Sequence, residues 1–151
     1  MNIEFTKKHI KAKTPARSHD NDSGYDVTAA EEAMVIKDAH GYISFLSYDT
    51  GIVVSPPENI YFLLYPRSSI RKYDLSLSNS VGVIDTSYRG NILVCFTPTI
   101  YTRKLDDLKV YDCGDRIAQL IPQIRLDITL KESDLVGNSE RGSMGFGSSG
   151  T

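Results

Sequence analysis

The chain has no tryptophan, and its 151 residues include only two cysteines and three histidines. Two cysteines, Cys95 and Cys113, cannot form a disulfide framework, so we expect a reduced, intracellular compartment. The histidines lie far apart in polar sequence, without the spacing of a zinc site. No segment has the glycine pattern of a P-loop or of a dinucleotide-binding turn, and no serine or cysteine nucleophile has a recognisable base. These absences exclude several common enzyme classes.

Long apolar runs are absent as well. None approaches the length of a membrane span, and residues 1–8 lack the apolar centre of a signal peptide. We therefore expect no membrane association and a cytoplasmic or nuclear location. The formal net charge is −2, which argues against a general nucleic-acid binder because phosphate-backbone contacts need a basic surface. A small anionic ligand held by a few arginines remains compatible with this charge.

Short runs rich in β-branched and aromatic residues fill the middle of the chain. They are residues 42–48, 51–54, 60–65, 91–97 and 117–130, the last broken by Pro122. In the fourth run, Ile92, Val94 and Phe96 alternate with residues that would face the opposite way. The pattern predicts an all-β sandwich or barrel and does not decide between them. The only helix expected is one or two turns around residues 69–73.

The C-terminal segment has a composition unlike the rest of the chain. Residues 141–150 carry four glycines, three serines, one arginine and one phenylalanine. Such a tail is typically flexible, yet it combines approachable backbone amides, hydroxyls and a cation suited to phosphate, and one ring that could cover a base. We therefore divide the chain into a β domain, 1–140, and a flexible lid for a nucleotide, 141–151. The alternative is a frayed glycine-serine tail.

Two segments near predicted strand ends carry groups suited to phosphate. Asp26 follows a glycine turn and starts a strand, so its carboxylate could hold hydrated Mg²⁺ or simply cap the turn. Residues 66–70 end an apolar strand at a proline and begin a helical turn. Arg67, Ser68, Ser69 and the following amides would meet an anion there, or serve only to cap the turn.

Residues 79–90 form the most suggestive interior stretch. Asn79 followed by Gly82-Val83-Ile84 could form a tight hairpin whose backbone reads the edge of a flat heterocycle. Asp85 comes directly after two large apolar residues, where a fixed carboxylate could act as general base on a water. Tyr88 could pack against a sugar. The alternative is an ordinary β-turn, but a turn needs neither the tyrosine nor the apolar pair, so we favour a functional role.

The last interior segment, residues 114–121, places two polar side chains in an apolar strand. We expect Arg116 to be buried and therefore paired, bracing a carboxylate in a structural role. A buried Gln119 must be hydrogen-bonded, which fits a structural role and a ligand contact equally.

Together these segments resemble the five motifs of the trimeric deoxyuridine triphosphatases (dUTPases). The motifs appear in order at residues 23–27, 66–70, 82–90, 114–121 and 141–150. The resemblance spans about residues 10–150. It implies a distorted jelly-roll β fold, a homotrimer with active sites shared between subunits, and Mg²⁺-assisted hydrolysis of dUTP to dUMP and pyrophosphate. Such an enzyme would limit uracil incorporation into DNA and supply dUMP for thymidylate synthesis.

The resemblance also assigns roles around the base and the sugar. Asp85 would activate the water that attacks the α-phosphorus. Asn79 and the backbone of Gly82, Val83, Ile84 and Asp85 would read uracil. Tyr88 would stack under the deoxyribose and exclude a 2′-hydroxyl.

The remaining roles concern the phosphates and the metal. Asp26 would contact Mg²⁺ through water. The phosphate ligands would be Arg67, Ser68, the amide of Ser69, and Gln119. From a neighbouring subunit, Phe146 would cover the uracil, and the distal phosphates would meet Arg141, Gly147, Ser148 and Ser149.

The chain departs from the family pattern at four positions. Ser69 and Ile70 replace the usual Gly-Leu of the second motif, and glycine there would allow close approach of backbone to phosphate. Ser87 stands where many relatives have an aspartate, which removes one acidic contact. Ser149 replaces threonine and keeps the hydroxyl. None of these changes removes a proposed catalytic group.

Three other functions remain as alternatives. A dCTP deaminase would share the fold and a motif like residues 67–69, but Asp85 and the phenylalanine-bearing tail favour the pyrophosphatase. A nucleotide-binding regulator would keep the pocket without turnover. A jelly-roll assembly protein would bind no nucleotide.

Overall fold

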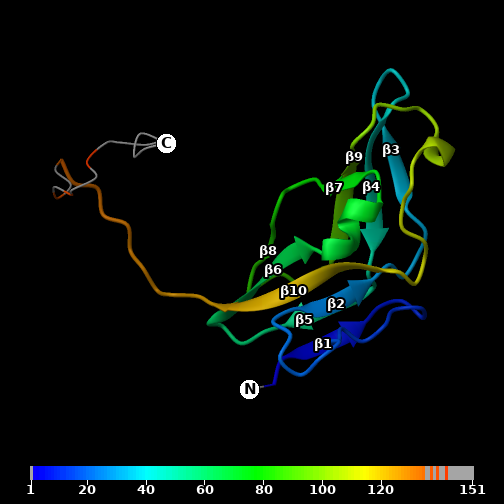
Figure 1. Cartoon of the computed structure of the whole chain (residues 1–151). Helices are drawn as coiled ribbons and strands as arrows, with labels where there is room; N and C mark the ends of the chain where they lie inside the picture. Colours follow the sequence, from blue (N-terminus) through cyan, green and yellow to red (C-terminus); the bar gives the residue numbers. More distant parts are fainter. Residues whose placement is uncertain (1, 135–136, 138, 140–141, 143–151) are drawn as a thin grey trace.

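The computed structural model describes residues 2–134, 137, 139 and 142. Ten strands and two short 3₁₀ turns, η1 and η2, follow one another along this part of the chain (Figure 1). The strands are β1 (Glu4–Lys7), β2 (Tyr25–Thr28), β3 (Met34–Lys37), β4 (Ile43–Asp49), β5 (Ile52–Ser55), β6 (Ile60–Pro66), β7 (Leu75–Leu77), β8 (Gly82–Ile84), β9 (Leu93–Pro98) and β10 (Arg116–Ile124). The 3₁₀ turns are η1 (Ser68–Lys72) and η2 (Leu105–Asp107).

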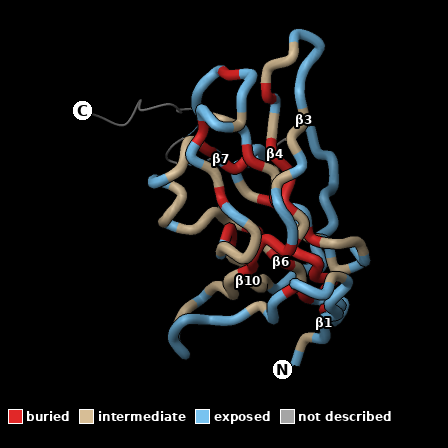
Figure 2. The backbone as a smooth tube through the Cα atoms, turned by 90° about the vertical axis from the view of Figure 1, so that its right-hand side faces the viewer, coloured by how far each residue is buried: buried red, intermediate tan, exposed pale blue. Residues whose placement is uncertain are grey.

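The strands form two four-stranded antiparallel sheets and one two-stranded sheet. Their orders are β2-β10-β6-β8, β3-β4-β9-β7 and β1-β5. One hydrophobic core draws on both larger sheets, and buried backbone runs through the middle of the molecule (Figure 2). This arrangement confirms the predicted all-β, jelly-roll-like class. The predicted helical turn is confirmed as η1, which follows β6 after one intervening residue.

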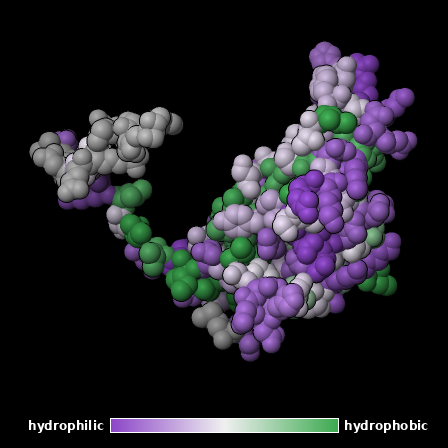
Figure 3. All heavy atoms as spheres, viewed as in Figure 1, coloured by the Kyte–Doolittle hydropathy of each residue, from purple (hydrophilic) through white to green (hydrophobic). Residues whose placement is uncertain are grey.

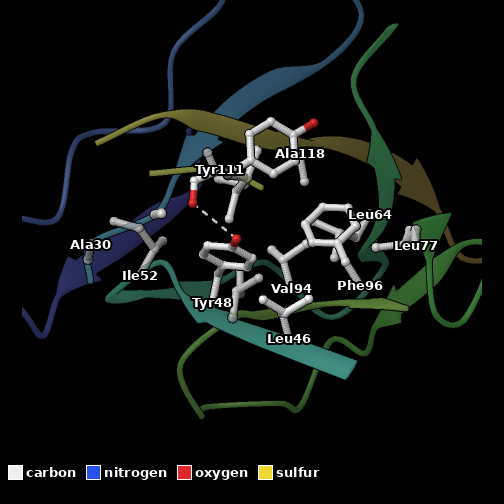
Figure 4. Packing of buried hydrophobic residues seen from close by; sticks show 14 of the residues in the cluster. Ala30, Leu46, Tyr48, Ile52, Leu64, Leu77, Val94, Phe96, Tyr111 and Ala118 are labelled. Carbon is white, nitrogen blue, oxygen red and sulfur yellow. Dashed lines mark hydrogen bonds between the residues drawn. The ribbon is translucent and has the colours of Figure 1, made fainter. Parts of the chain in front are cut away.

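Strand alternation places the core side chains. Ile92, Val94 and Phe96 are fully buried, whereas Leu93 is 48 % exposed, so β9 alternates as predicted. Tyr48 on β4 packs edge-on against Phe96, with ring centroids 5.9 Å apart (Figure 4). The two rings come from neighbouring strands of one sheet, and both belong to the core that the two larger sheets share.

Three local expectations were wrong. Pro122 does not break the last strand: it lies inside β10, opposite Phe62, beyond the point where pairing with β2 ends at Leu120. At Pro122 the side of β10 that faced β2 is no longer paired, so the N–H that proline lacks is not needed there. Arg116 is half exposed rather than buried, because a register shift between Arg116 and Ala118 interrupts the alternation.

The third correction concerns the hairpin expected at Gly82. β7 pairs with β9 and β8 pairs with β6, so the two strands beside this turn lie in different sheets. The turn itself is tight: the Val81 N–H donates to the Asn79 carbonyl at 2.6 Å, and Ser80 has φ 60°. A non-glycine residue in this conformation is strained, and such strain often lies at functional sites.

Both cysteines are free. Within the described residues, the chain has no helix with the length and hydrophobicity that crossing a bilayer requires. The cytoplasmic or nuclear location stays a prediction.

Candidate active site

Asp26 on β2 lies between two arginines. Its Oδ1 accepts from Arg67 Nε at 2.7 Å, and its Oδ2 accepts from Arg116 Nη1 at 3.0 Å. The Asp26 side chain is only 14 % exposed, so these charge-assisted bonds form in a partly desolvated setting that strengthens them. Arg116 also donates to the Ser18 hydroxyl at 2.9 Å. The expectation that Arg116 braces a carboxylate is confirmed.

Arg67 is therefore fixed by its inner nitrogen, which leaves its terminal nitrogens for another anion. Arg67 precedes η1 in an extended conformation, and the first bond of the turn runs from the Ile70 N–H to the Arg67 carbonyl at 3.0 Å. The amides of Ser68 and Ser69 come before that first donor, so the turn does not use them. A guanidinium beside two such amides is a suitable place for a phosphate.

Gln119 on β10 lies beside this group. It pairs in register with Asp26 on one side and Tyr65 on the other. Its Nε2 donates to the Pro66 carbonyl at 3.2 Å, and a Cβ on Gly24 would lie 2.5 Å from its Oε1. These residues enclose a hollow of about 240 Å³, lined by Ser18, Asp22, Ser23, Gly24, Asp26, Arg67, Ser68 and Gln119. The structure thus brings together three of the expected phosphate ligands, Arg67, Ser68 and Gln119.

Asp85 lies in a different place, directly after β8. It opens a turn in which the Tyr88 N–H donates to the Asp85 carbonyl at 3.0 Å. The side chain is exposed, and among the described residues no hydrogen bond to its carboxylate is formed. It lines a second, wider hollow of about 860 Å³ whose apolar members include Val83, Leu126 and Ile128. The partly apolar setting expected for this carboxylate is therefore present on one side.

The neighbours of Asp85 are held by specific contacts. The Tyr88 hydroxyl donates to the Asn91 carbonyl at 3.0 Å. A Cβ on Gly90 would lie 2.4 Å from that hydroxyl, so the glycine leaves room for the ring. A Cβ on Gly82 would lie 3.0 Å from the Leu64 Cβ and 3.3 Å from Asn79 Nδ2. Glycine here lets the Asn79 amide lie close to the strand backbone, as it must if both are to hydrogen-bond the edge of one base.

The strand register separates these two groups of residues. Ile84 lies opposite Phe62 on β6, so Asp85, one residue on, is level with Tyr61. Arg67 follows the other end of β6, six residues from Tyr61. At about 3.3 Å per residue, that distance is about 20 Å along the strand. Asp85 and Arg67 of one chain therefore cannot meet on one phosphate group.

Comparison with known proteins identifies the family. The dUTPase family model matches residues 10–150. The chain belongs to the dUTPase family. A deoxyuridine 5'-triphosphate nucleotidohydrolase of Rickettsia bellii is 37 % identical, over 91 % of this chain and 87 % of that protein. The corresponding protein of Corynebacterium glutamicum is 34 % identical, over 98 % of this chain and 94 % of its own length.

A solved structure agrees with this assignment. The Staphylococcus bacteriophage 80alpha dUTPase G164S mutant with dUpNHpp has a TM-score of 0.79 and 26 % identity, and the match covers 99 % of each chain. The fold of the described residues is thus that of a dUTPase. The reading as a dCTP deaminase finds no support in these relatives.

The acidic residues of this dUTPase do not form a metal cage. Among residues 2–134, no three side chains of His, Cys, Asp or Glu gather to hold an ion. Both oxygens of Asp26 already accept from arginines, although each keeps a further lone pair. Mg²⁺ usually keeps several waters and binds through one or two carboxylates plus substrate phosphates. Asp26 therefore fits a magnesium ion that arrives with the nucleotide and is contacted through water.

Some site residues were missed or lie elsewhere. Arg141, Phe146, Gly147, Ser148 and Ser149 are outside the described residues, so their roles remain predictions. Ser18 was not singled out, and Gly24 was noted only as a turn residue, although both line the hollow beside Arg67. Gly24 lies inside the first motif, so its position carried a signal. Ser18 carried none, because its bond to Arg116 spans 98 positions in the sequence.

Replacing Gly24 with alanine is expected to raise KM for dUTP about tenfold. The new Cβ would lie 2.5 Å from Gln119 Oε1 and 3.1 Å from Gln119 Cβ, so the Gln119 side chain must leave its position and its polar contact is lost. Steady-state kinetics measure this effect. Gly137→Ala is the matched control, because nothing lies within 4 Å of its added Cβ. Equal KM values for the two variants would contradict the assigned role of Gln119.

Proposed function

We propose that this chain hydrolyses dUTP to dUMP and pyrophosphate at a site shared between copies of the chain. One copy supplies the phosphate-binding residues around Arg67, and another copy supplies Asp85. The observation that carries the proposal is the separation of about 20 Å along β6, set by the register of β6 and β8. A homotrimer, as the family resemblance implies, provides the second copy by symmetry.

Among the phosphate-binding residues, Arg67 donates hydrogen bonds from its terminal nitrogens to the triphosphate. Ser68, the Ser69 amide and Gln119 add hydrogen bonds around the same chain of phosphates. Attack on a triphosphate needs positioning and charge neutralisation more than covalent chemistry. Mg²⁺, held by the substrate phosphates and by Asp26 through water, would neutralise charge on the phosphates when bound. Arg116 keeps the Asp26 carboxylate oriented so that it can hold Arg67 and contact Mg²⁺ through water.

In the other copy, Asp85 takes a proton from the attacking water, and the water oxygen attacks the α-phosphorus. Asn79 and the backbone of residues 82–85 hydrogen-bond the edge of uracil. Tyr88, whose ring is fixed through Asn91, lies under the deoxyribose and leaves no space for a 2′-hydroxyl. These roles select a deoxyuridine nucleotide by hydrogen-bond pattern and by shape.

An exposed apolar stripe supports assembly with other copies. Beyond β10 the chain extends away from the body (Figure 1), and hydrophobic residues lie along this extension (Figure 3). Leu126 and Ile128 are each 71 % exposed and Leu130 is 94 % exposed. Alternation of this kind is a strand pattern whose apolar face lacks cover within one chain. A second copy that covered this face would bury it. Because Asp85 lies beside the face, it would then lie near the phosphate-binding residues of the other copy.

The C-terminal segment completes the proposal. Residues 141–151 would close over the nucleotide of a neighbouring site, with Phe146 on the base and Arg141, Gly147, Ser148 and Ser149 at the distal phosphates. Closure of such a lid excludes water other than the attacking one and competing substrates.

The direct test is pyrophosphate release from dUTP, dTTP, dCTP and UTP, with and without Mg²⁺. We expect release from dUTP alone, with strong dependence on Mg²⁺. Ammonia release from dCTP would support a deaminase instead. Tight binding of dUTP without pyrophosphate release would support a nucleotide-binding regulator. Absence of any nucleotide binding would support an assembly protein.

A further inference from the structure

Tyr111 lies directly under the phosphate-binding turn. It is 1 % exposed, and its carbonyl accepts from the Tyr48 hydroxyl at 3.0 Å, so its backbone is tied to the core. Its ring lies 3.8 Å from the ring of Tyr73, centroid to centroid. Tyr73 is the residue that ends η1. The Tyr111 ring therefore supports the turn that presents Arg67, Ser68 and Ser69.

The Tyr111 hydroxyl is an unusual group in this core. It is buried, and within the described part of the chain it makes no hydrogen bond of good geometry. Native proteins rarely leave a buried hydroxyl unpaired, because its lost hydration is then not replaced. In Figure 4 the hydroxyl points away from Tyr48 and Phe96, toward the edge of the cluster. The group thus needs a partner outside the apolar core.

Ser69 is the polar side chain that acts on this hydroxyl. Burial raises the pKa of Tyr111, while the nearby Ser69 hydroxyl and the charge of Arg67 oppose the rise. The Ser69 Oγ also lies 3.4 Å from Arg67 Nη1, at the long end for a hydrogen bond. The Ser69 hydroxyl is therefore near both the Tyr111 hydroxyl and the Arg67 guanidinium, without a strong bond to either. Its family counterpart is usually glycine, which has no hydroxyl to place there.

We infer that Tyr111 is a positioning residue for the triphosphate and acts through Ser69. When the triphosphate is bound, the Tyr111 O–H donates to Ser69 Oγ, and the Ser69 O–H donates to a phosphate oxygen beside Arg67. A hydroxyl can accept one bond while it donates another, and acceptance strengthens the bond that it donates. This inference rests on the proposed function, because it adds one more contact between the phosphate-binding residues and the triphosphate.

The test is the Kd for dUpNHpp, a non-hydrolysable nucleotide, measured by calorimetry on the full chain. Tyr111→Phe keeps the ring and removes only the hydroxyl, so we expect Kd to rise about five- to tenfold. KM for dUTP should rise by the same factor with kcat nearly unchanged, because the contact forms before the reaction begins. The melting temperature of the chain without nucleotide should not fall, because the hydroxyl that is removed makes no hydrogen bond in that state. Tyr42→Phe, on a half-buried ring stacked on Tyr101, is the control and should leave Kd unchanged.

A second variant separates positioning from mere packing. In a Ser69→Gly background, Tyr111→Phe should have no further effect on Kd, because the group through which it acts is gone. An equal effect in both backgrounds, or an unchanged Kd in Tyr111→Phe alone, would overturn the inference. These outcomes remain distinct from failure of the proposed function. A wild-type chain that binds dUpNHpp without hydrolysing dUTP would contradict that function, while the Kd comparison still decides the role of Tyr111.

Discussion

Replacing Asp85 with asparagine is expected to lower the rate of dUTP hydrolysis about 10²–10⁴-fold, the usual loss when a positioned base is removed. Asparagine keeps the size of the side chain but cannot take a proton from water. The Kd for dUpNHpp should change little, because uracil is read by backbone groups and by Asn79. Stability should also be preserved, since the Asp85 side chain is exposed. Single-turnover kinetics and calorimetry measure the two quantities separately.

Glu58→Gln is a matched control for this variant. Glu58 is an exposed carboxylate that lines the same wide hollow as Asp85, and it has no role in the proposed reaction. Its loss should leave the rate within about twofold, as most surface substitutions do. A similar decrease for both variants would show that the charge of the hollow, rather than one base, matters. Near wild-type turnover by Asp85→Asn would refute the assignment of the base.

Replacing Arg67 with alanine is expected to reduce kcat/KM about 10²–10³-fold, the usual loss of a group that stabilises transition-state charge. Both affinity and rate should suffer, because the guanidinium meets the phosphates before and during the reaction. The fold should survive, since Asp26 keeps its bond to Arg116 at 3.0 Å. Lysine should rescue poorly, because it cannot bind Asp26 and a phosphate with separate nitrogens. Kinetics on purified Arg67→Ala and Arg67→Lys measure these effects.

Arg71→Ala provides the comparison for Arg67. Arg71 belongs to the same turn and is exposed, and it makes no contact with Asp26. Its removal should change kcat/KM no more than about threefold, the scale of a screened surface charge. If Arg71→Ala were as damaging as Arg67→Ala, general attraction by the basic turn would explain the effect instead.

Much of the fold followed from alternation in the sequence. Ile92, Val94 and Phe96 could be assigned to the core because a strand turns alternate side chains to one face. Arg116 could not be placed correctly, because the register shift beside it depends on the partner strand β2. The position of Pro122 inside β10 likewise depended on where pairing with β2 ends. These errors lie where a strand's environment is set by its neighbours rather than by its own residues.

The site was predicted as a set of residues but not as an arrangement. The motifs gave the chemistry of Arg67, Gln119 and Asp85, and five motifs in order gave the family. Their order along the chain does not reveal which of them meet in one chain, because that depends on the register of β6 and β8. Tyr111 had no signal at all, because its role depends on the turn that packs above it.

In the proposed shared site, Arg67 of one copy and Asp85 of another serve the same nucleotide. The most direct measurement co-expresses Arg67→Ala with Asp85→Asn in equal amounts and assays the purified mixed assemblies. Each variant alone is expected to be nearly inactive.

In randomly mixed trimers, half of the Arg67 positions and half of the Asp85 positions are intact. About a quarter of the shared sites should then hold both residues, so about a quarter of wild-type activity should return. Mixed assemblies that stay as inactive as the separate variants would contradict a shared site.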